Sequence, residues 1–350
     1  MRTLSCTLAV LLLTVAIPAR RHKAATPPSF IARHQRAPAA TSYHRAASIH
    51  VQSSLVVAPV TVIDHRGNFV ESLRRRQFRV LDNGVPQRIT QFGLAIEPVT
   101  AVILVETDRR VAPLLNHVRP LGSEFWGLLL GNYGASAVIA FGDRVRLLQD
   151  FSTGPKTLER TLRRLSARGH NARLNDAMAD AIRMLAEQPI TERRVIVVFS
   201  EGFDRGSKTS EAEVLRAATA ADVAVYGLRF GRGQAPLEHS REEWNSDTSP
   251  SVDFLPLVEL GLGIGRAALS RNLIQQYASF TGGVVYTHWK RQTLQDELQR
   301  IALEINSQYI VAYVPSTLRE RGFHRIEIKL AQPSLQVRVR AGYFTGSKAK

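Results

Sequence analysis

The segment VILVETD at 102–108 constrains the fold more than any other feature of this sequence. Four apolar residues, three of them β-branched, lead into two carboxylates, Glu106 and Asp108. A short continuous apolar run is typical of a strand that is buried on both faces of a parallel sheet. A second run, VIVVF at 195–199, is followed two residues later by Glu201. Since open α/β sheets bind ligands outside the carboxyl ends of their strands, the two runs predict a site at one edge of one sheet.

Strand and helix patterns alternate over residues 99–290, the range that we assign to an α/β domain. Besides the run at 102–105, strands are predicted at 135–141, 144–150, 195–199, 223–230 and 284–286, and helices at 111–130, 157–165, 176–187, 210–221 and 264–279. Pro120 predicts a kink or break in the first helix, and 231–263 reads as a long polar insertion. The alternation predicts an α/β fold with a doubly wound, mostly parallel sheet and helices on both faces.

Short strand patterns flank this domain on both sides. About four are predicted before it, at 55–63, 69–70, 78–81 and 85–92, and three after it, at 309–314, 324–330 and 335–339. Asp82-Asn83-Gly84 is a strong hairpin signal. Neither set is large enough to form a comfortable core alone, so we expect the halves 51–98 and 291–345, the second beginning with a linking helix, to combine into one β-sandwich.

The first 19 residues resemble a secretory signal peptide, with Arg2, an apolar stretch at 8–15 and a Pro18-Ala19 pair. The apolar stretch is too short to span a bilayer, and no other segment resembles a membrane span. The only cysteine, Cys6, lies in this segment, so a mature chain would contain no disulfide. Residues 20–50 are expected to be a flexible linker and 346–350 a polar tail. We therefore expect an exported protein, periplasmic or secreted.

The chain of 350 residues carries 46 Lys and Arg against 30 Asp and Glu, a formal net charge of +16. Such an excess favours acidic partners such as acidic glycans or anionic lipid headgroups, although it is also compatible with a role in solubility alone. Arg74-Arg75-Arg76 is interpreted either as an anion-binding turn or as a solvated one. Nucleic acid is an unlikely partner, because no stripe of alternating aromatic and basic residues is present.

The order of the motifs resembles a von Willebrand factor A-type (VWFA) domain. The segments that carry the resemblance are VILVETD, GASAVIAFGDRVRLLQDFST, NDAMADAIRML, RRVIVVFSEGFDRGS, DVAVYGLRF and TGGVVY. The flanks, including VTVIDHRGNFVESLRRRQFRVLDNGVPQRITQF and INSQYIVAYVPS, resemble a bacterial group of secreted VWFA-related proteins. The resemblance spans about 51–344.

The resemblance implies a metal-ion-dependent adhesion site, in which Asp-x-Ser-x-Ser, a Thr and a later Asp hold Mg²⁺ for an acidic group of a partner. Mg²⁺ prefers such hard oxygen ligands in near-octahedral geometry. This chain departs from the pattern at nearly every ligand position, which correspond to Glu106, Asp108, Arg110, Ala172 (with Asn171 beside it) and Glu201. The predicted ligand-binding edge comprises Glu106, Thr107, Asp108, Arg109, Arg110, Asn171, Ala172 and Glu201.

Three hypotheses for this edge remain open. Glu106, Asp108 and Glu201 still bind a divalent ion such as Mg²⁺; or Arg110 replaces the metal and pairs with these carboxylates, since buried charges need partners; or the residues point into solvent. The second hypothesis, with no cofactor, is the leading expectation.

The leading functional hypothesis is a non-enzymatic, exported protein-interaction or adhesion module with a degenerate metal site. Arg109 and Arg110 would bind a carboxylate of a protein or surface ligand, with Arg205 and Lys208 widening the patch. Alternatives are a binder of anionic polymer through a basic surface and a structural scaffold with a decayed site. A hydrolase is disfavoured, because Ser200 lies outside a G-x-S-x-G motif and no zinc-binding spacing occurs.

Overall fold

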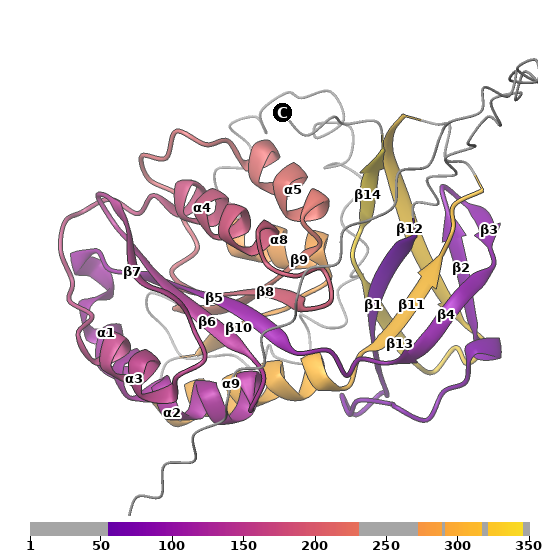
Figure 1. The fold of residues 1–350 in the computed structure, drawn as a ribbon, viewed down its shortest axis with the longest axis horizontal. Helices are drawn as coiled ribbons and strands as arrows, with labels where there is room; N and C mark the ends of the chain where they lie inside the picture. The colour runs from indigo at the N-terminus through magenta and orange to yellow at the C-terminus, as the bar shows by residue number, and fades with distance from the viewer. Residues whose placement is uncertain (1–54, 231–271, 289–290, 317–320, 346–350) are drawn as a thin grey trace, which may run out of the picture. The chain divides into compact units, whose positions relative to one another are not determined.

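The computed structural model describes residues 55–230, 272–288, 291–316 and 321–345. They belong to one structural unit, Gln52–Lys350, in which a sheet flanked by helices adjoins two antiparallel sheets (Figure 1). The predicted signal peptide, linker, insertion and tail lie outside the described residues. In the described ranges, no helix is both long and apolar enough to cross a membrane.

The α/β part is built on a six-stranded sheet with the order β10-β9-β8-β5-β6-β7. Its strands are β5 (Val99–Glu106), β6 (Ala135–Phe141), β7 (Val145–Ser152), β8 (Arg193–Ser200), β9 (Val223–Phe230) and β10 (Val285–His288). All neighbours are parallel except β7, which runs antiparallel to β6. Successive strands are added outward from β5 on one side and from β8 on the other, so the predicted doubly wound sheet is confirmed.

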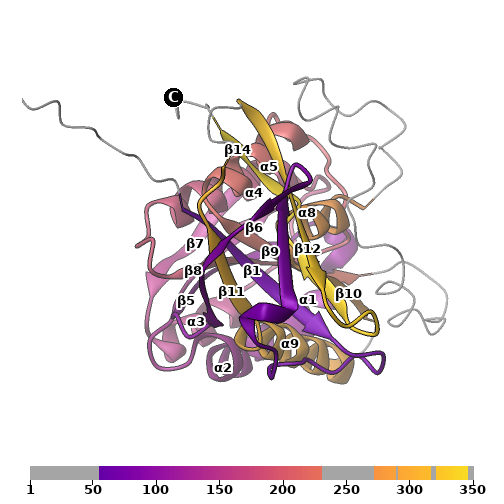
Figure 2. The same ribbon diagram turned by 90° about the vertical axis from the view of Figure 1, so that its right-hand side faces the viewer.

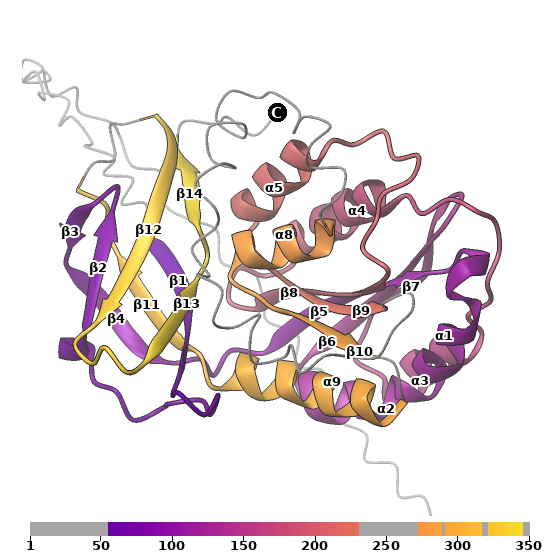
Figure 3. The ribbon, with the colours of Figure 1, turned by 180° about the vertical axis from the view of Figure 1, so that it is seen from behind.

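The continuous apolar run of β5 follows from burial on both faces of the sheet. Every residue of this strand is buried. Val102 and Leu104 pack in one core with α4, α5 and α8, whereas Ile103 packs in a second core with α1, α3 and α9. Figure 3 shows these two layers of helices on opposite sides of the sheet. The helices are α1 (Ala112–Val118), α3 (Pro155–Arg163), α4 (Leu174–Ala186), α5 (Glu211–Ala220), α8 (Leu273–Thr281) and α9 (Arg291–Asn306).

The helix predicted at 111–130 is a series of short helical segments. After α1 come a 3-10 turn at Arg119–Leu121, α2 (Gly122–Phe125) and a π-helical turn at Trp126–Leu130. Pro120 lies in the 3-10 turn, and it cannot donate the backbone hydrogen bond that a continuing α-helix requires. The predicted break is therefore present.

The flanking strands form two four-stranded antiparallel sheets with the orders β13-β1-β11-β4 and β14-β12-β2-β3. Their strands are β1 (Val56–Ile63), β2 (Phe78–Asp82), β3 (Val85–Gln87), β4 (Ile89–Leu94), β11 (Tyr309–Tyr313), β12 (Gly322–Leu330), β13 (Gln336–Val339) and β14 (Gly342–Thr345). Each sheet combines strands from before and after the α/β domain, and both contribute to one apolar core. The predicted β-sandwich is confirmed.

The sandwich differs from the sequence prediction in three details. The segment predicted as one strand at 85–92 is two strands, because the chain leaves one sheet at Gln87 and enters the other at Ile89. Phe69 forms a single bridge with Ile63 instead of a strand. Residues 342–345 add the strand β14, so the described residues form eight sandwich strands rather than about seven.

A buried polar network joins the sandwich to the α/β domain. Glu304 of α9 forms an ion pair with Arg338 of β13, and its Oε1 also accepts a hydrogen bond from Thr61 of β1 (3.2 Å). Gln308, which follows α9, donates to Thr61 Oγ1 (3.0 Å) and to the Tyr226 hydroxyl of β9 (3.3 Å). Figure 2, which faces the sandwich, shows α9 near the lower end of β11. The two parts are thus held together by directional bonds as well as by apolar packing.

A second buried polar cluster lies inside the sandwich around Asp82. Its Oδ2 accepts hydrogen bonds from the hydroxyls of Tyr313 (2.9 Å) and Tyr343 (2.6 Å), and its Oδ1 lies 2.9 Å from His324 Nδ1. Burial holds the pKa of both tyrosines well above the usual value, so the hydroxyls remain donors. Because the four residues come from four strands in both sheets, the cluster fixes how the sheets face each other.

Replacing Asp82 with alanine is expected to lower the free energy of unfolding by about 3–5 kcal/mol, because the tyrosine hydroxyls and the imidazole would lose their buried acceptor. Urea denaturation of the full chain measures the change. The matched control is Asp296→Ala on the exposed face of α9, which should stay within about 0.5 kcal/mol of the wild type. Similar losses in the two variants would contradict the role of the cluster.

Candidate functional site

The carboxyl ends of β5 and β8 meet where the sheet changes its direction of winding. β5 ends at Glu106 and β8 ends at Ser200, and the two strands are parallel neighbours. Ligands of doubly wound sheets bind in the crevice at such a point. The two runs singled out in the sequence therefore deliver their carboxylates to the same edge.

Glu106 is fully buried, and hydrogen bonds orient its carboxylate. Its Oε2 accepts from Ser200 Oγ (2.6 Å) and from the backbone amide of Glu201 (2.8 Å). Ser200 Oγ in turn accepts from the amide of Gly202 (2.9 Å). These bonds leave Oε1 as the oxygen that faces the edge of the sheet.

Asp108 is also fully buried and caps the short helical turn that follows β5. Its Oδ1 accepts hydrogen bonds from the amides of Arg110 (2.8 Å) and Val111 (3.2 Å). An aspartate at this position satisfies amides that have no partner within the helix. As in Glu106, one oxygen accepts hydrogen bonds from backbone amides, and the other, Oδ2, faces the edge.

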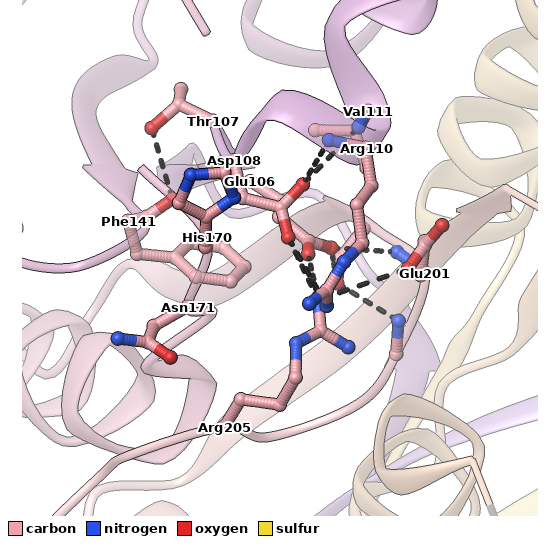
Figure 4. A network of polar contacts seen from close by, with 12 residues as sticks. Glu106, Thr107, Asp108, Arg110, Val111, Phe141, His170, Asn171, Glu201 and Arg205 are labelled. Atoms are coloured by element: carbon pink, nitrogen blue, oxygen red, sulfur yellow. Dashed lines mark hydrogen bonds and ion pairs between the residues drawn. The ribbon is translucent and has the colours of Figure 1, made fainter. Parts of the chain in front are cut away.

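The side chain that faces all three carboxylates is Arg205. Its Nη2 lies 3.1 Å from Glu106 Oε1, 2.9 Å from Asp108 Oδ2 and 3.8 Å from Glu201 Oε2 (Figure 4). A backbone bridge holds Arg205 in place: its amide donates to the Ala172 carbonyl (2.7 Å), and the Ala172 amide donates to its carbonyl (3.3 Å). Ala172, which occupies the threonine position of the family pattern, thus positions Arg205 through its backbone.

The prediction that Arg110 replaces a metal is wrong about the residue. Arg110 Nη1 lies 3.7 Å from Asp108 Oδ2, and its side chain is 38% exposed. Among the ion pairs of the described residues, Arg110 has this one, whereas Arg205 has three. The reason is local geometry: Arg110 lies within the helical turn Arg109–Val111 that Asp108 caps, so its side chain approaches the site from the rim (Figure 4).

The other predicted site residues form the rim or support it. Arg109 and Asn171 are exposed, and the amides of His170 and Asn171 donate to Asp143 Oδ1 (3.1 and 2.9 Å). Thr107 is buried and donates through Oγ1 to the Phe141 carbonyl (3.0 Å), so it supports the loop rather than facing a ligand.

The family pattern implies that side-chain oxygens at this edge hold Mg²⁺. The oxygens that face the edge are Glu106 Oε1, Asp108 Oδ2 and Glu201 Oε2, and all three lie around Arg205 Nη2. Ala172 supplies no side-chain oxygen. In the described part of the chain, no group of three or more His, Cys, Asp or Glu side chains has an arrangement that could hold a metal ion. As folded, these residues fit a guanidinium and do not fit an octahedral ion.

Burial raises the pKa of Glu106 to about 7. The negative charges of Asp108 and Glu201 act in the same direction, whereas the hydrogen bonds from Ser200 and the Glu201 amide act against it. The carboxyl therefore changes its charge near neutral pH, beside a guanidinium that stays charged.

Sequence reasoning gave Arg205 only a peripheral role and treated Ser200 as a failed nucleophile. In the structure Arg205 is the central cation, and Ser200 orients Glu106. Buried carboxylates require a cation nearby, and this requirement predicted that an arginine lies among them. The spacing of residues in the sequence does not give the loop conformation that places Arg205 there.

Comparison with known proteins agrees with this topology. The family model described as the von Willebrand factor type A domain matches residues 129–203, which include β6, β7, α3, α4 and β8. Part of the α/β domain therefore matches the von Willebrand factor type A family, and we refer to the α/β domain as the type A domain below. No curated protein matches the sequence.

Solved structures that are similar to this chain at low sequence identity include the following three. An aerotolerance-related membrane protein from Bacteroides fragilis, carrying multiple mutations to serine, is 16% identical, with a TM-score of 0.42 over 59% of this chain and 98% of that one. BatB from Bacteroides thetaiotaomicron is 16% identical, with a TM-score of 0.41 and the same coverages. A von Willebrand factor type A protein from Catenulispora acidiphila is 10% identical, with a TM-score of 0.45 over 84% of this chain and 64% of that one.

Arg205→Ala is expected to lower the free energy of unfolding by about 3–5 kcal/mol, because it leaves buried carboxylates without their cation. Arg110→Ala, which removes a half-exposed arginine from the same site, should cost at most about 1 kcal/mol. Urea denaturation of both variants provides the comparison. A larger loss in the Arg110 variant would restore the original assignment of the central cation.

The raised pKa of Glu106 makes stability depend on pH. The pKa of Glu106 is about 7 in the folded protein, whereas the pKa of a glutamate in the unfolded chain is about 4.3, so the folded protein binds the proton more tightly. The contribution of this proton to the free energy of unfolding is therefore complete below about pH 4.3. It is lost as the pH rises through the folded pKa of about 7.

Glu106→Gln should make the decline in unfolding free energy from about pH 4.5 to 7 less steep than in the wild type. Burial also raises the pKa of Glu211 to about 7, so Glu211→Gln is the matched variant that keeps the Glu106 contribution. Urea denaturation across the pH range gives the slopes. An unchanged slope in Glu106→Gln would show that this carboxyl does not titrate on unfolding.

Proposed function

We propose that this protein is a non-enzymatic interaction module, exported from the cell, whose type A domain binds an acidic group of a protein partner without a metal ion. The observation that carries the proposal is the position of Arg205 Nη2 among Glu106, Asp108 and Glu201 at the switch point of the sheet. In this interpretation the adhesion site is degenerate, and an internal guanidinium provides the positive charge that a bound ion would otherwise supply.

Unused donors at the edge support recognition of an acidic group. Nη2 of Arg205 faces the buried carboxylates, and no described residue accepts a hydrogen bond from its Nη1; its Nε is buried and also has no acceptor among the described residues. The guanidinium of Arg110 is partly exposed above it, and Arg109 is exposed beside it. A carboxylate that enters the rim would meet several N–H groups in the planar arrangement that favours bidentate binding.

The geometry of the polar groups supports binding rather than catalysis. Ser200, the hydroxyl nearest to the carboxylates along the chain, is fully buried and donates to Glu106. A nucleophile needs both access to substrate and a base that takes its proton, and a buried hydroxyl held by a carboxylate under a cation has no access. This arrangement favours the interaction module over a hydrolase.

The proposal is tested with an array of short peptides, each carrying one Asp or Glu in a neutral context, against matched Asn and Gln versions. We expect the full chain to bind a subset of acidic peptides equally well in EDTA and in excess Mg²⁺. Arg110→Gln should weaken that binding about 10-fold, since a charge-assisted hydrogen bond is worth about 1.5–3 kcal/mol.

The matched control is Arg160→Gln on the exposed side of α3, which should leave peptide binding unchanged. Equal binding of the amide versions would refute recognition of an acidic group. A requirement for Mg²⁺, or a rise in melting temperature when Mg²⁺ is added, would refute the metal-independent site, because a ligand specific to the folded state must stabilise it.

A further inference from the structure

Six cationic side chains gather at one end of the sheet β14-β12-β2-β3, away from the edge of the type A domain. We call this set the basic cluster; it consists of Arg74, Arg75, Arg76, Arg79, Arg88 and Lys329. The first three lie in and beside the 3-10 turn that precedes β2, and the Gln77 carbonyl accepts from the Ala331 amide just past β12 (2.9 Å). The cluster thus combines residues of β2 and β12 with the turn before β2 and the residue that follows β3.

The strand register sets two of these cations side by side, because Lys329 of β12 is directly opposite Arg79 of β2. Arg88 follows β3, whose last residue, Gln87, is opposite Val80. Phe78 and Val80 are buried whereas Arg79 is exposed, so the side chain of Arg79 lies on the outer face. Like charges directly opposite each other destabilise a sheet, so folding alone does not favour this arrangement.

The charges of the basic cluster are not neutralised by ion pairs. In the described ranges, none of the six side chains lies within ion-pair distance of a carboxylate. Glu327, the acidic side chain two positions before Lys329, lies 3.4 Å from Arg325 Nε instead. All six side chains are exposed. The cluster is therefore a surface of positive charge that no described carboxylate neutralises.

The surroundings of the cluster indicate which class of anion fits. A membrane surface is usually bound by cations together with apolar side chains that insert, and single-stranded nucleic acid by cations together with aromatic platforms. In the described part of this sheet, Val85 is the exposed large hydrophobic residue, and it lies at the opposite, hairpin end of β3. Charge alone is therefore available for recognition.

We propose that the basic cluster binds a linear acidic polysaccharide. Neighbouring strands lie about 4.8 Å apart, so Lys329 and Arg79 present a row of cations on the outer face, and the arginines before β2 and after β3 extend it. Repeating carboxylates or sulfates along an extended chain can contact such a row without insertion or stacking. The site is independent of the function proposed for the type A domain, because it shares no residue with that edge.

The test measures binding of the full chain to heparin, a sulfated probe, and to alginate, a carboxylated one, at several salt concentrations. The variant Arg75→Ser/Arg76→Ser/Arg79→Ser should bind both polymers about 10-fold more weakly at moderate salt and show a shallower salt dependence, because fewer counterions are released. Thermal melting confirms that each variant folds.

The matched control removes three exposed arginines from α3 and its end, Arg160→Ser/Arg163→Ser/Arg164→Ser. It lowers the net charge by the same amount and should change polymer binding less than about twofold. Equal weakening in the two triple variants would show that binding follows net charge and would overturn the assignment.

Vesicles containing anionic lipid and a single-stranded oligonucleotide serve as competing probes. Binding of the wild type to vesicles or to the oligonucleotide, without binding to either polysaccharide, would overturn the proposal in favour of those classes. Binding to heparin but not alginate would narrow the anion to a sulfate polymer, which supports the proposal.

Discussion

The burial of three carboxylates at the end of two adjacent strands is the constraint on which this site depends. Glu106 and Asp108 are fully buried and Glu201 nearly so, and removing such charges from water is costly unless a cation lies close. Arg205 supplies that cation from the loop after β8, and its backbone pairs with Ala172 in another loop. Charge compensation thus fixes the positions of three loops at once. Arg205 and the three carboxylates form the base of the edge that a partner would meet.

The same principle recurs at two other places in the chain. Glu304 and Arg338 are paired at the junction of the sandwich with the type A domain, and Asp82 gathers two tyrosines and a histidine inside the sandwich. Each cluster joins residues that are distant in sequence, and each would lose its compensation if strands were paired in another register. Apolar packing tolerates many arrangements, whereas a buried charge with directional donors tolerates few. These clusters therefore contribute specificity to a fold that has halves of one sandwich at both ends of an inserted domain.

The sequence predicted the type A fold and the sandwich because both depend on patterns that are local. The buried run of β5, the strand-helix alternation and the Asn83-Gly84 turn, where both residues have positive φ, are all readable in short windows. The division of 85–92 between two sheets was not readable, because it depends on which sheet each half joins. At the site, spacing placed Glu106 and Glu201 correctly at one edge. Spacing favoured Arg110 over Arg205 as the central cation, and it was wrong because that choice depends on the path of the loop after β8.

A guanidinium and a divalent ion give the edge different properties, even where they sit among the same carboxylates. Mg²⁺ would bring two charges and open positions that exchange water for an acidic ligand. Arg205 brings one charge, which leaves the three carboxylates in excess, and protonation of one of them reduces that excess. The raised pKa of Glu106 places that protonation near neutral pH, and Arg110 adds a second cation at the rim. A carboxylate that approaches the edge therefore meets less repulsion when Glu106 carries its proton, so binding of an acidic group and proton uptake by Glu106 favour each other by linkage.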